Sequence, residues 1–264
     1  MSRITSLLAA TGLLFLSSTA FAQEGGDGAT GDVAREITGP RTMLKTNLVG
    51  LALTSINGNV EYKTGGASSV GLLGGYKLPQ TITVNGWAET VSDGQQTYTG
   101  EIEPSGWFIN PYARIYAKEA FHGFYVEPFL RFFGFDYKVP YDYEKNNTTI
   151  RAFADGEASG WGGGLGFGTS FDIAPRIFLD INLGFGIAQG DIYVITSDPN
   201  LDAQDYQDIK AKIEENKNAD VEILILGSVL DELEAGANET SAWAEMNDVI
   251  MPIFRGGIHF GFAF

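Results

Sequence analysis

The sequence predicts an all-β protein: an eight-stranded antiparallel up-and-down transmembrane β-barrel with a partly helical long extracellular loop. Three observations carry this prediction. Apolar and other residues alternate with a period of two in many short runs, which is typical of strands whose faces meet different environments. After the N-terminal region, no apolar run reaches the roughly 18 residues of a transmembrane helix candidate. The 264 residues include 34 Gly and 12% aromatics but no Cys.

The first 22 residues read as a signal peptide. Arg3 supplies positive charge, residues 7–16 are apolar, and Ala20-Phe21-Ala22 resembles a cleavage site, so the mature chain is expected to begin at Gln23. The alternative is a membrane anchor, but the apolar run is shorter than the roughly 20 residues that span a bilayer. Residues 23–41 are rich in Gly, Asp and Thr and predict a flexible periplasmic leader.

Eight strands are expected within 42–264. Trp107–Tyr116 shows the pattern: Trp107, Ile109 and Ile115 share one face, and Asn110 and Arg114 the other. The strands predicted in this way are 43–53, 58–64, 68–78, 106–117, 123–135, 159–171, 176–189 and 250–264. In the sixth strand, glycines share one face and leave room for large neighbouring side chains or for tight curvature; they are Gly162, Gly164, Gly166 and Gly168.

The connections alternate in length, as in bacterial barrels with short periplasmic turns and long extracellular loops. Strands 2–3, 4–5 and 6–7 are joined by short turns, and longer links cover 79–105, 136–158 and 190–249. Only the short link 54–57 breaks the alternation. Both termini of an even-stranded barrel lie on one side, so the C-terminus is expected where the short turns are.

The second face of the predicted strands carries single charges among Gly and Tyr rather than the Lys and Glu of a water-facing surface. This favours apolar faces toward lipid and these charges toward the lumen: Lys45, Glu61, Arg114, Glu127, Arg131, Asp180 and Arg255. The set could line an ion pathway or form ion pairs that plug a narrow barrel. Because side chains fill an eight-stranded barrel and the two signs nearly balance, the plug is preferred.

The last strand alternates in the same way and ends in three spaced aromatics. Phe260, Phe262 and Phe264 fall on the face expected to meet lipid, and Arg255 and His259 on the other. A soluble periplasmic lipid-binding barrel would share the alternation and is the rival at the level of the fold.

Three segments resemble small outer-membrane β-barrel proteins of the Bacteroidota type, with the barrel architecture of OmpA and OmpX. Lys45–Tyr62 is similar to their opening hairpin, Gly123–Arg131 to a mid-barrel strand, and Gly256–Phe264 to the C-terminal signal read by the barrel-assembly machinery. The resemblance implies a cell outer membrane protein in contact with outer-membrane lipid, with Phe260, Phe262 and Phe264 as the assembly signal. It implies no particular activity.

No catalytic site, metal site or cofactor is predicted. The two histidines, His122 and His259, both fall on the periplasmic half, away from an outer-leaflet substrate. The expected role is therefore non-enzymatic, structural or surface-binding, with a small pore or transport accessory as the alternative and an outer-membrane enzyme as a distant one. The net charge of −16 argues against a nucleic acid partner, because phosphate binding needs Lys and Arg.

Between Asp191 and Asp248 the chain holds 15 Asp and Glu against three Lys. Residues 202–218 predict a helix that begins near Asp198-Pro199, as part of a cap over the outer mouth. Four aspartates there could offer oxygen ligands to a divalent cation: Asp198, Asp202, Asp205 and Asp208. They lack a Ca²⁺-loop pattern, so a solvated acidic face is preferred. An extracellular or envelope protein is the expected partner of 190–249.

Overall fold

A computed structural model describes residues 39–85, 99–145, 148–216, 222–223, 227–228 and 233–264. The expected signal peptide (1–22) and nearly all of the expected leader (23–41) lie outside the described residues. Of the two helices described, neither is both long and apolar enough to cross a membrane.

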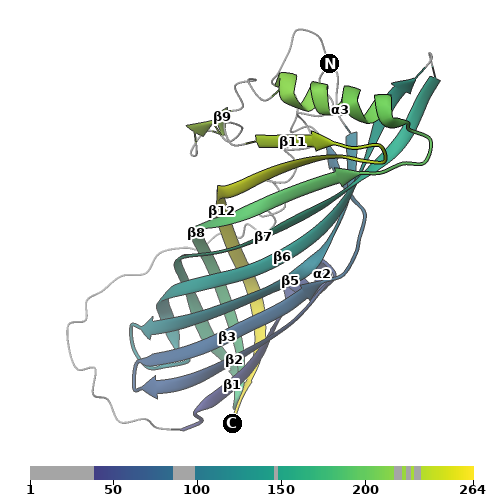
Figure 1. The fold of residues 1–264 in the computed structure, drawn as a ribbon. Helices are drawn as coiled ribbons and strands as arrows, with labels where there is room; N and C mark the ends of the chain where they lie inside the picture. The colour runs from purple at the N-terminus through teal and green to yellow at the C-terminus, as the bar shows by residue number, and fades with distance from the viewer. Residues whose placement is uncertain (1–38, 86–98, 146–147, 217–221, 224–226, 229–232) are drawn as a thin grey trace.

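Eight antiparallel strands form a ring (Figure 1). They are β1 (Thr42–Asn47), β2 (Ser55–Gly65), β3 (Ser68–Lys77), β5 (Thr99–Tyr116), β6 (Gly123–Lys145), β7 (Thr148–Ala174), β8 (Ile177–Thr196) and β12 (Ala242–Ala263). Each pairs with the next along the chain, and β1 also pairs with β12, from Met43↔Ala263 to Asn47↔His259. The up-and-down order of eight strands is confirmed.

The short turns gather at one end of the ring. Residues 66–67, 117–122 and 175–176 connect the strands there, and the C-terminus lies at the same end (Figure 1). The Thr42 N–H donates to the Phe264 carbonyl at 3.1 Å and the Phe264 N–H to the Thr42 carbonyl at 2.8 Å. The predicted placement of the C-terminus beside the short turns is confirmed.

The first predicted strand, 43–53, is wrong in its second half. Residues Leu48–Ala52 form the short helix α2, because the Asn47 side chain accepts from the N–H groups of Val49 (3.1 Å) and Gly50 (3.3 Å) and caps a helical turn. The next strand, β2, accordingly begins at Ser55 instead of residue 58.

The predicted long loops are also wrong in extent, because the strands continue far beyond the ring. β6 and β7 pair as far as Lys145↔Thr148, so 136–158 is a long hairpin. β5 begins at Thr99 and pairs with β4 (Ile82–Asn85), within the segment predicted as the 79–105 loop. β8 and β12 pair to Thr196↔Ala242, which shortens the predicted 190–249 loop to 197–241. Small residues such as Ala152 and Ala154 are buried in these extensions, so one face of the paired strands remains packed beyond the ring.

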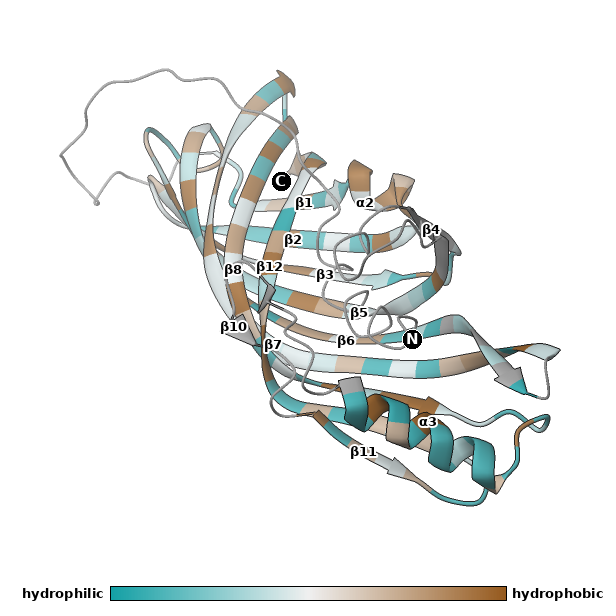
Figure 2. Ribbon diagram, turned by 90° about the horizontal axis from the view of Figure 1, so that it is seen from above, coloured by the Kyte–Doolittle hydropathy of each residue, from teal (hydrophilic) through white to brown (hydrophobic). Residues whose placement is uncertain are grey.

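The two faces of the ring strands have opposite character. Along β7, Trp161, Leu165, Phe167 and Phe171 point outward and are 40–61% exposed. Phe260 and Phe262 on β12, and Phe264 directly after it, are exposed, whereas Arg255, His259 and Ala263 are buried inside. The hydropathy colours alternate along β8 and β12 in Figure 2. The ring is therefore apolar outside and charged inside, as the alternation predicts.

A second layer packs on the outer extensions of the strands. It comprises α3 (Ala203–Asn216) and β11 (Leu233–Ala237), which pairs with β12; β9 (Glu222–Ile223) pairs with β10 (Gly227–Ser228). The spacing of Tyr206, Ile209 and Ile213 places all three on one buried helix face, packed with Leu233 and Met246 in a hydrophobic core. The helix predicted over 202–218 is confirmed, with observed bounds of Ala203–Asn216.

Candidate functional site: the interior charge network

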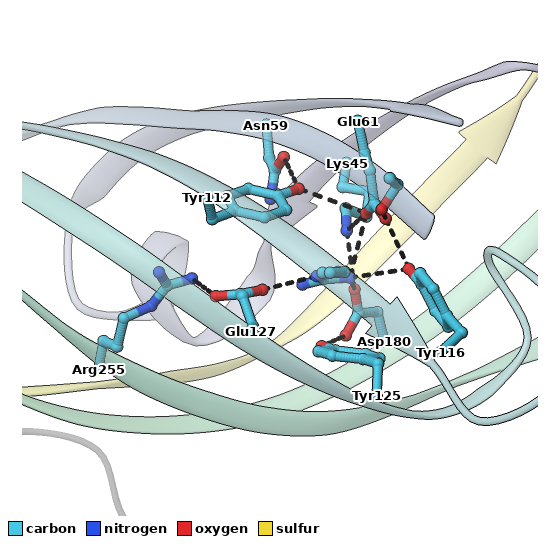
Figure 3. Close-up of polar contacts among 11 residues, drawn as sticks. Lys45, Asn59, Glu61, Tyr112, Tyr116, Tyr125, Glu127, Asp180 and Arg255 are labelled. Atoms are coloured by element: carbon cyan, nitrogen blue, oxygen red, sulfur yellow. Dashed lines mark hydrogen bonds and ion pairs between the residues drawn. The ribbon is translucent and has the colours of Figure 1, made fainter. Parts of the chain in front are cut away.

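Arg114 of β5 is the hub of a buried cluster inside the ring. Figure 3 shows its carboxylate partners Glu61, Glu127 and Asp180 converging there. Its Nη1 lies 2.5 Å from Asp180 Oδ2 and 3.1 Å from Glu61 Oε2, and its Nε lies 2.6 Å from Glu127 Oε2. The guanidinium thus joins carboxylates from β2, β6 and β8. Its plane also lies over the Tyr125 ring, 3.9 Å from the centroid, a favourable cation–π contact.

Two further cations complete the network. Lys45 Nζ contacts Glu61 and lies 2.8 Å from Asp180 Oδ2, while Arg255 Nη2 lies 2.7 Å from Glu127 Oε1. We call Lys45, Glu61, Arg114, Glu127, Asp180 and Arg255 the interior charge network. Its three cations and three carboxylates are nearly inaccessible and cancel in charge, as buried charges require.

Hydroxyl groups satisfy the remaining carboxylate oxygens. Ser69 Oγ (2.5 Å) and the Tyr116 hydroxyl (2.6 Å) donate to Glu61 Oε1, and the Tyr125 hydroxyl donates to Asp180 Oδ1 at 2.5 Å. The Tyr112 hydroxyl donates to Asn59 Oδ1 at 2.7 Å. The sequence prediction named none of these residues as site residues. Their shared inward parity with the charged residues is the signal that could have found them.

Six of the seven residues predicted as the lumen charge network are brought together, and Arg131 is not. Arg131 faces inward from β6, but among the described residues no carboxylate lies within ion-pair distance of it. Its guanidinium instead lies over the Phe108 ring, 5.0 Å from the centroid. Arg131 is four residues from Glu127 along the strand, about 13 Å, which separates it from the carboxylates of the network.

The glycines of β7 serve both roles proposed for them. A Cβ at Gly168 would lie 2.5 Å from the Tyr125 hydroxyl, so this glycine makes room for an inward side chain. A Cβ at Gly164 would lie 2.0 Å from the Phe185 carbonyl oxygen of β8, so there the backbones approach too closely for any side chain.

Every carboxylate oxygen of the network is bound by a cation or a hydroxyl group. His259 is buried inside the ring, where it is the register partner of Asp180. His122 lies in a turn, with its Nε2 3.1 Å from an Asp172 oxygen. The described part of the chain contains no cluster of three or more His, Cys, Asp or Glu able to hold a metal ion.

A second polar cluster joins α3 to the tip of β6. Lys145 Nζ lies 2.7 Å from Asp202 Oδ2 and also contacts Asp205, and the Tyr143 hydroxyl donates to Asp205 Oδ1 at 3.1 Å. We call Tyr143, Lys145, Asp202 and Asp205 the outer clasp. Two of the four aspartates considered as cation ligands therefore hold a lysine ammonium.

The outer clasp shifts the titration of its members. Hydrogen bonds from Lys145 lower the pKa of Asp202, and despite partial desolvation they also lower the pKa of Asp205. The same hydrogen bonds raise the pKa of Lys145, and the bond with Asp202 contributes most. Burial, together with the hydrogen bond to Asp205, raises the pKa of Tyr143 to about 12. Asp202 Oδ1 also accepts from the N–H groups of Gln204 (3.0 Å) and Asp205 (3.2 Å), so the clasp caps α3.

Comparison with known proteins identifies a family without an assigned activity. Residues 30–219 match the family described as "Protein of unknown function (DUF3575)", and the matched range includes both the interior charge network up to Asp180 and helix α3. No curated protein and no solved structure matches the chain. Because the match covers well over half of the sequence, the chain belongs to the DUF3575 family.

Proposed function

We propose that this protein is a membrane-spanning β-barrel of the bacterial outer membrane, with a structural or surface-binding role. The observation that carries the proposal is the inverted polarity of the ring. Large apolar side chains such as Leu165, Ile187 and Phe262 are 48–64% exposed outside, while a six-residue charge network is buried inside. A water-soluble ring would place these two sets the other way round.

The dimensions of the apolar surface fit a bilayer. On β7 the exposed large apolar residues of the ring run from Ile173 to Trp161, twelve residues apart. At about 3.3 Å per residue and a tilt of about 40°, this gives a band roughly 30 Å tall, close to the hydrocarbon thickness of a bilayer and to the roughly 25 Å band of outer-membrane barrels. Above Trp161 the next outward positions on the same strand are polar or charged and exposed, at Ser159, Glu157 and Asp155, before the exposed Phe153. Trp107 and Trp161 lie at this boundary, where interfacial aromatics are expected.

The charge network supports a closed interior rather than a pore. It ties β1, β2, β5, β6, β8 and β12 to one another through ion pairs at a single level of the ring. Eight-stranded barrels are just wide enough for side chains to fill. The proposed protein therefore displays its outer layer, α3 and β11, on a closed support. The exposed Phe260, Phe262 and Phe264 stripe would be read by the assembly machinery.

Heat-modifiable migration tests the membrane barrel directly. Purified from the membrane fraction in detergent, the unboiled protein should migrate differently from the boiled protein, and reconstitution into lipid vesicles should protect the ring from protease. Recovery in the soluble periplasmic fraction, with one migration state, would favour the soluble lipid-binding barrel instead. A steady single-channel current in planar bilayers would contradict the closed interior.

The role of the outer layer can be tested separately. Thr196 and Ala242 are register partners, so a short hairpin loop can replace 197–241 without breaking the ladder. The shortened protein should still assemble and show heat-modifiable migration but lose binding to an extracellular or envelope partner. Loss of assembly would mean that the layer serves folding and not recognition.

A further inference from the structure

Arg131 adds a charge that the interior does not balance. With it, this part of the ring holds four cationic groups, Lys45, Arg114, Arg131 and Arg255, against the three carboxylates of the interior charge network. A buried or semi-buried charge without a counter-ion is costly and is normally paired. Arg131 keeps its charge under all ordinary conditions, because a guanidinium does not lose its proton in proteins.

Unpartnered donors accumulate beside Arg131. The Arg255 guanidinium lies over the Phe129 ring, 4.6 Å from the centroid, and Phe129 is two residues from Arg131 on the same inward face of β6, so the two like-charged groups are neighbours. Arg131 Nε and Arg255 Nη1 are both buried and, within the described part of the chain, have no hydrogen-bond partner. Asn110, whose buried Oδ1 is also unpartnered, lies beside Arg131 in the register of the adjacent strand β5. Two positive groups with unpartnered N–H donors beside one neutral acceptor favour a ligand with negative charge at this place.

Neither arginine faces a side chain on the neighbouring strand toward the other arginine. Arg131 is the register partner of Gly162, and Arg255 of Gly184. Although Arg131 faces inward, it remains partly accessible, whereas Glu127 on the same face of β6 is 1% exposed. Arg131 thus lies four residues beyond Glu127 along β6, on the side of the network toward α3.

We propose that Arg131 and Arg255 form an interior binding site for a small oxyanion, a carboxylate or a phosphate. Planar guanidinium groups pair with such anions through two parallel N–H···O bonds, and the anion would offset the unbalanced charge. The site lies on the outer side of the charge network, so a ligand would enter through the mouth that carries α3. The inference adds a ligand to the proposed closed barrel and does not require conduction.

The test uses the folded full chain in detergent, titrated with acetate, with inorganic phosphate and with chloride at constant ionic strength. Isothermal titration and the midpoint of thermal unfolding are the readouts. We expect saturable binding of acetate or phosphate that exceeds any effect of chloride, and the stronger of the two identifies the anion class. R131Q should weaken this binding about tenfold or more, since hydrogen bonds to charged groups are lost.

K138Q is the matched control, because Lys138 lies on the same strand but pairs with exposed Asp155 outside, at 3.5 Å. K138Q should bind the oxyanion with the same affinity as the unsubstituted protein. R131K keeps the charge without the planar fork and should bind with intermediate affinity, which covers the case in which R131Q does not fold. The proposed site is wrong if the folded protein binds neither oxyanion. It is also wrong if R131Q binds the anion as tightly as the unsubstituted protein. Heat-modifiable migration scores folding independently of anion binding. A folded protein that does not bind anions would therefore contradict the site without contradicting the proposed barrel.

Discussion

Arg255 on β12 reaches Glu127 on β6 at 2.7 Å, although β7 and β8 lie between them in the ring. The ladder explains the reach. Glu127 pairs with Gly166, Gly166 with Gly184, and Gly184 with Arg255, so both intervening positions lack a side chain. Two glycines thereby allow an ion pair between strands that share no hydrogen bonds.

Filling one of these positions should disturb the pair. A Cβ at Gly184 would lie 2.9 Å from Arg255 Cγ and 3.2 Å from Phe129 Cε1. We expect Gly184→Val to destabilise the fold by about 1–3 kcal/mol through overpacking, measured by urea unfolding in detergent. Gly58→Val is the control, since a Cβ there meets nothing within 4 Å. Equal urea midpoints for Gly184→Val and Gly58→Val would show that the interior can accommodate the added side chain.

Removing the charge of Glu127 should lower the free energy of unfolding more than Gly184→Val does. Glu127→Gln leaves both Arg114 and Arg255 without one of their carboxylate contacts inside the ring. Breaking a buried pair by removal of one partner costs about 3–5 kcal/mol. The exposed pair Lys138–Asp155 provides the comparison: Asp155→Asn should change the unfolding free energy by about 0–1 kcal/mol. A small effect of Glu127→Gln would mean that water solvates the network.

A charge placed on the apolar exterior tests the proposed membrane span. Leu165 is 61% exposed and lies near the middle of the apolar band. Leu165→Arg should reduce the stability of the vesicle-embedded protein by about 2–4 kcal/mol. Glu157→Arg, on the same face of β7 but beyond the band, should have little effect. If both substitutions are neutral in vesicles, the exterior does not face lipid.

The outer clasp should make the attachment of α3 depend on pH. The folded-state pKa values of Asp202 and Asp205 are lowered, so their contribution is present above the ordinary value of 3.8 and is lost as pH falls through the folded values. The pKa of Lys145 is raised, so its contribution is present below 10.5 and is lost as pH rises through the folded value. The clasp should therefore be complete from about pH 5 to pH 10.

Hydrogen exchange of the α3 amides measures this dependence. Protection should fall below about pH 4 beyond the intrinsic pH effect on exchange, and Lys145→Met should lower it at neutral pH. Lys210→Met removes only the 3.5 Å pair with Glu214 on the helix surface and serves as the control. Unchanged protection in Lys145→Met would show that the apolar face of Tyr206, Ile209 and Ile213 holds the helix alone.

The sequence by itself determined the two-faced character of the strands. Period-two alternation is local, so Lys45, Asp180 and Arg255 could be assigned to one face without knowledge of any partner. The same reasoning located the end of the ring at which Phe264 lies, and the α3 helix from its apolar spacing. It failed at residues 48–53, where the capping side chain of Asn47 overrides the apolar run, and at the strand ends, where a buried face continues beyond the ring.

Only the tertiary structure decided which charges meet. Arg114 contacts Asp180, 66 residues away, because the register of all eight strands brings both to one level of the ring. Arg131 shares the inward face but lies above that level, and it therefore has no place in the network that the sequence assigned to it. The face of a residue follows from its neighbours in the chain, whereas its height and its partners follow from the closed set of strand pairings.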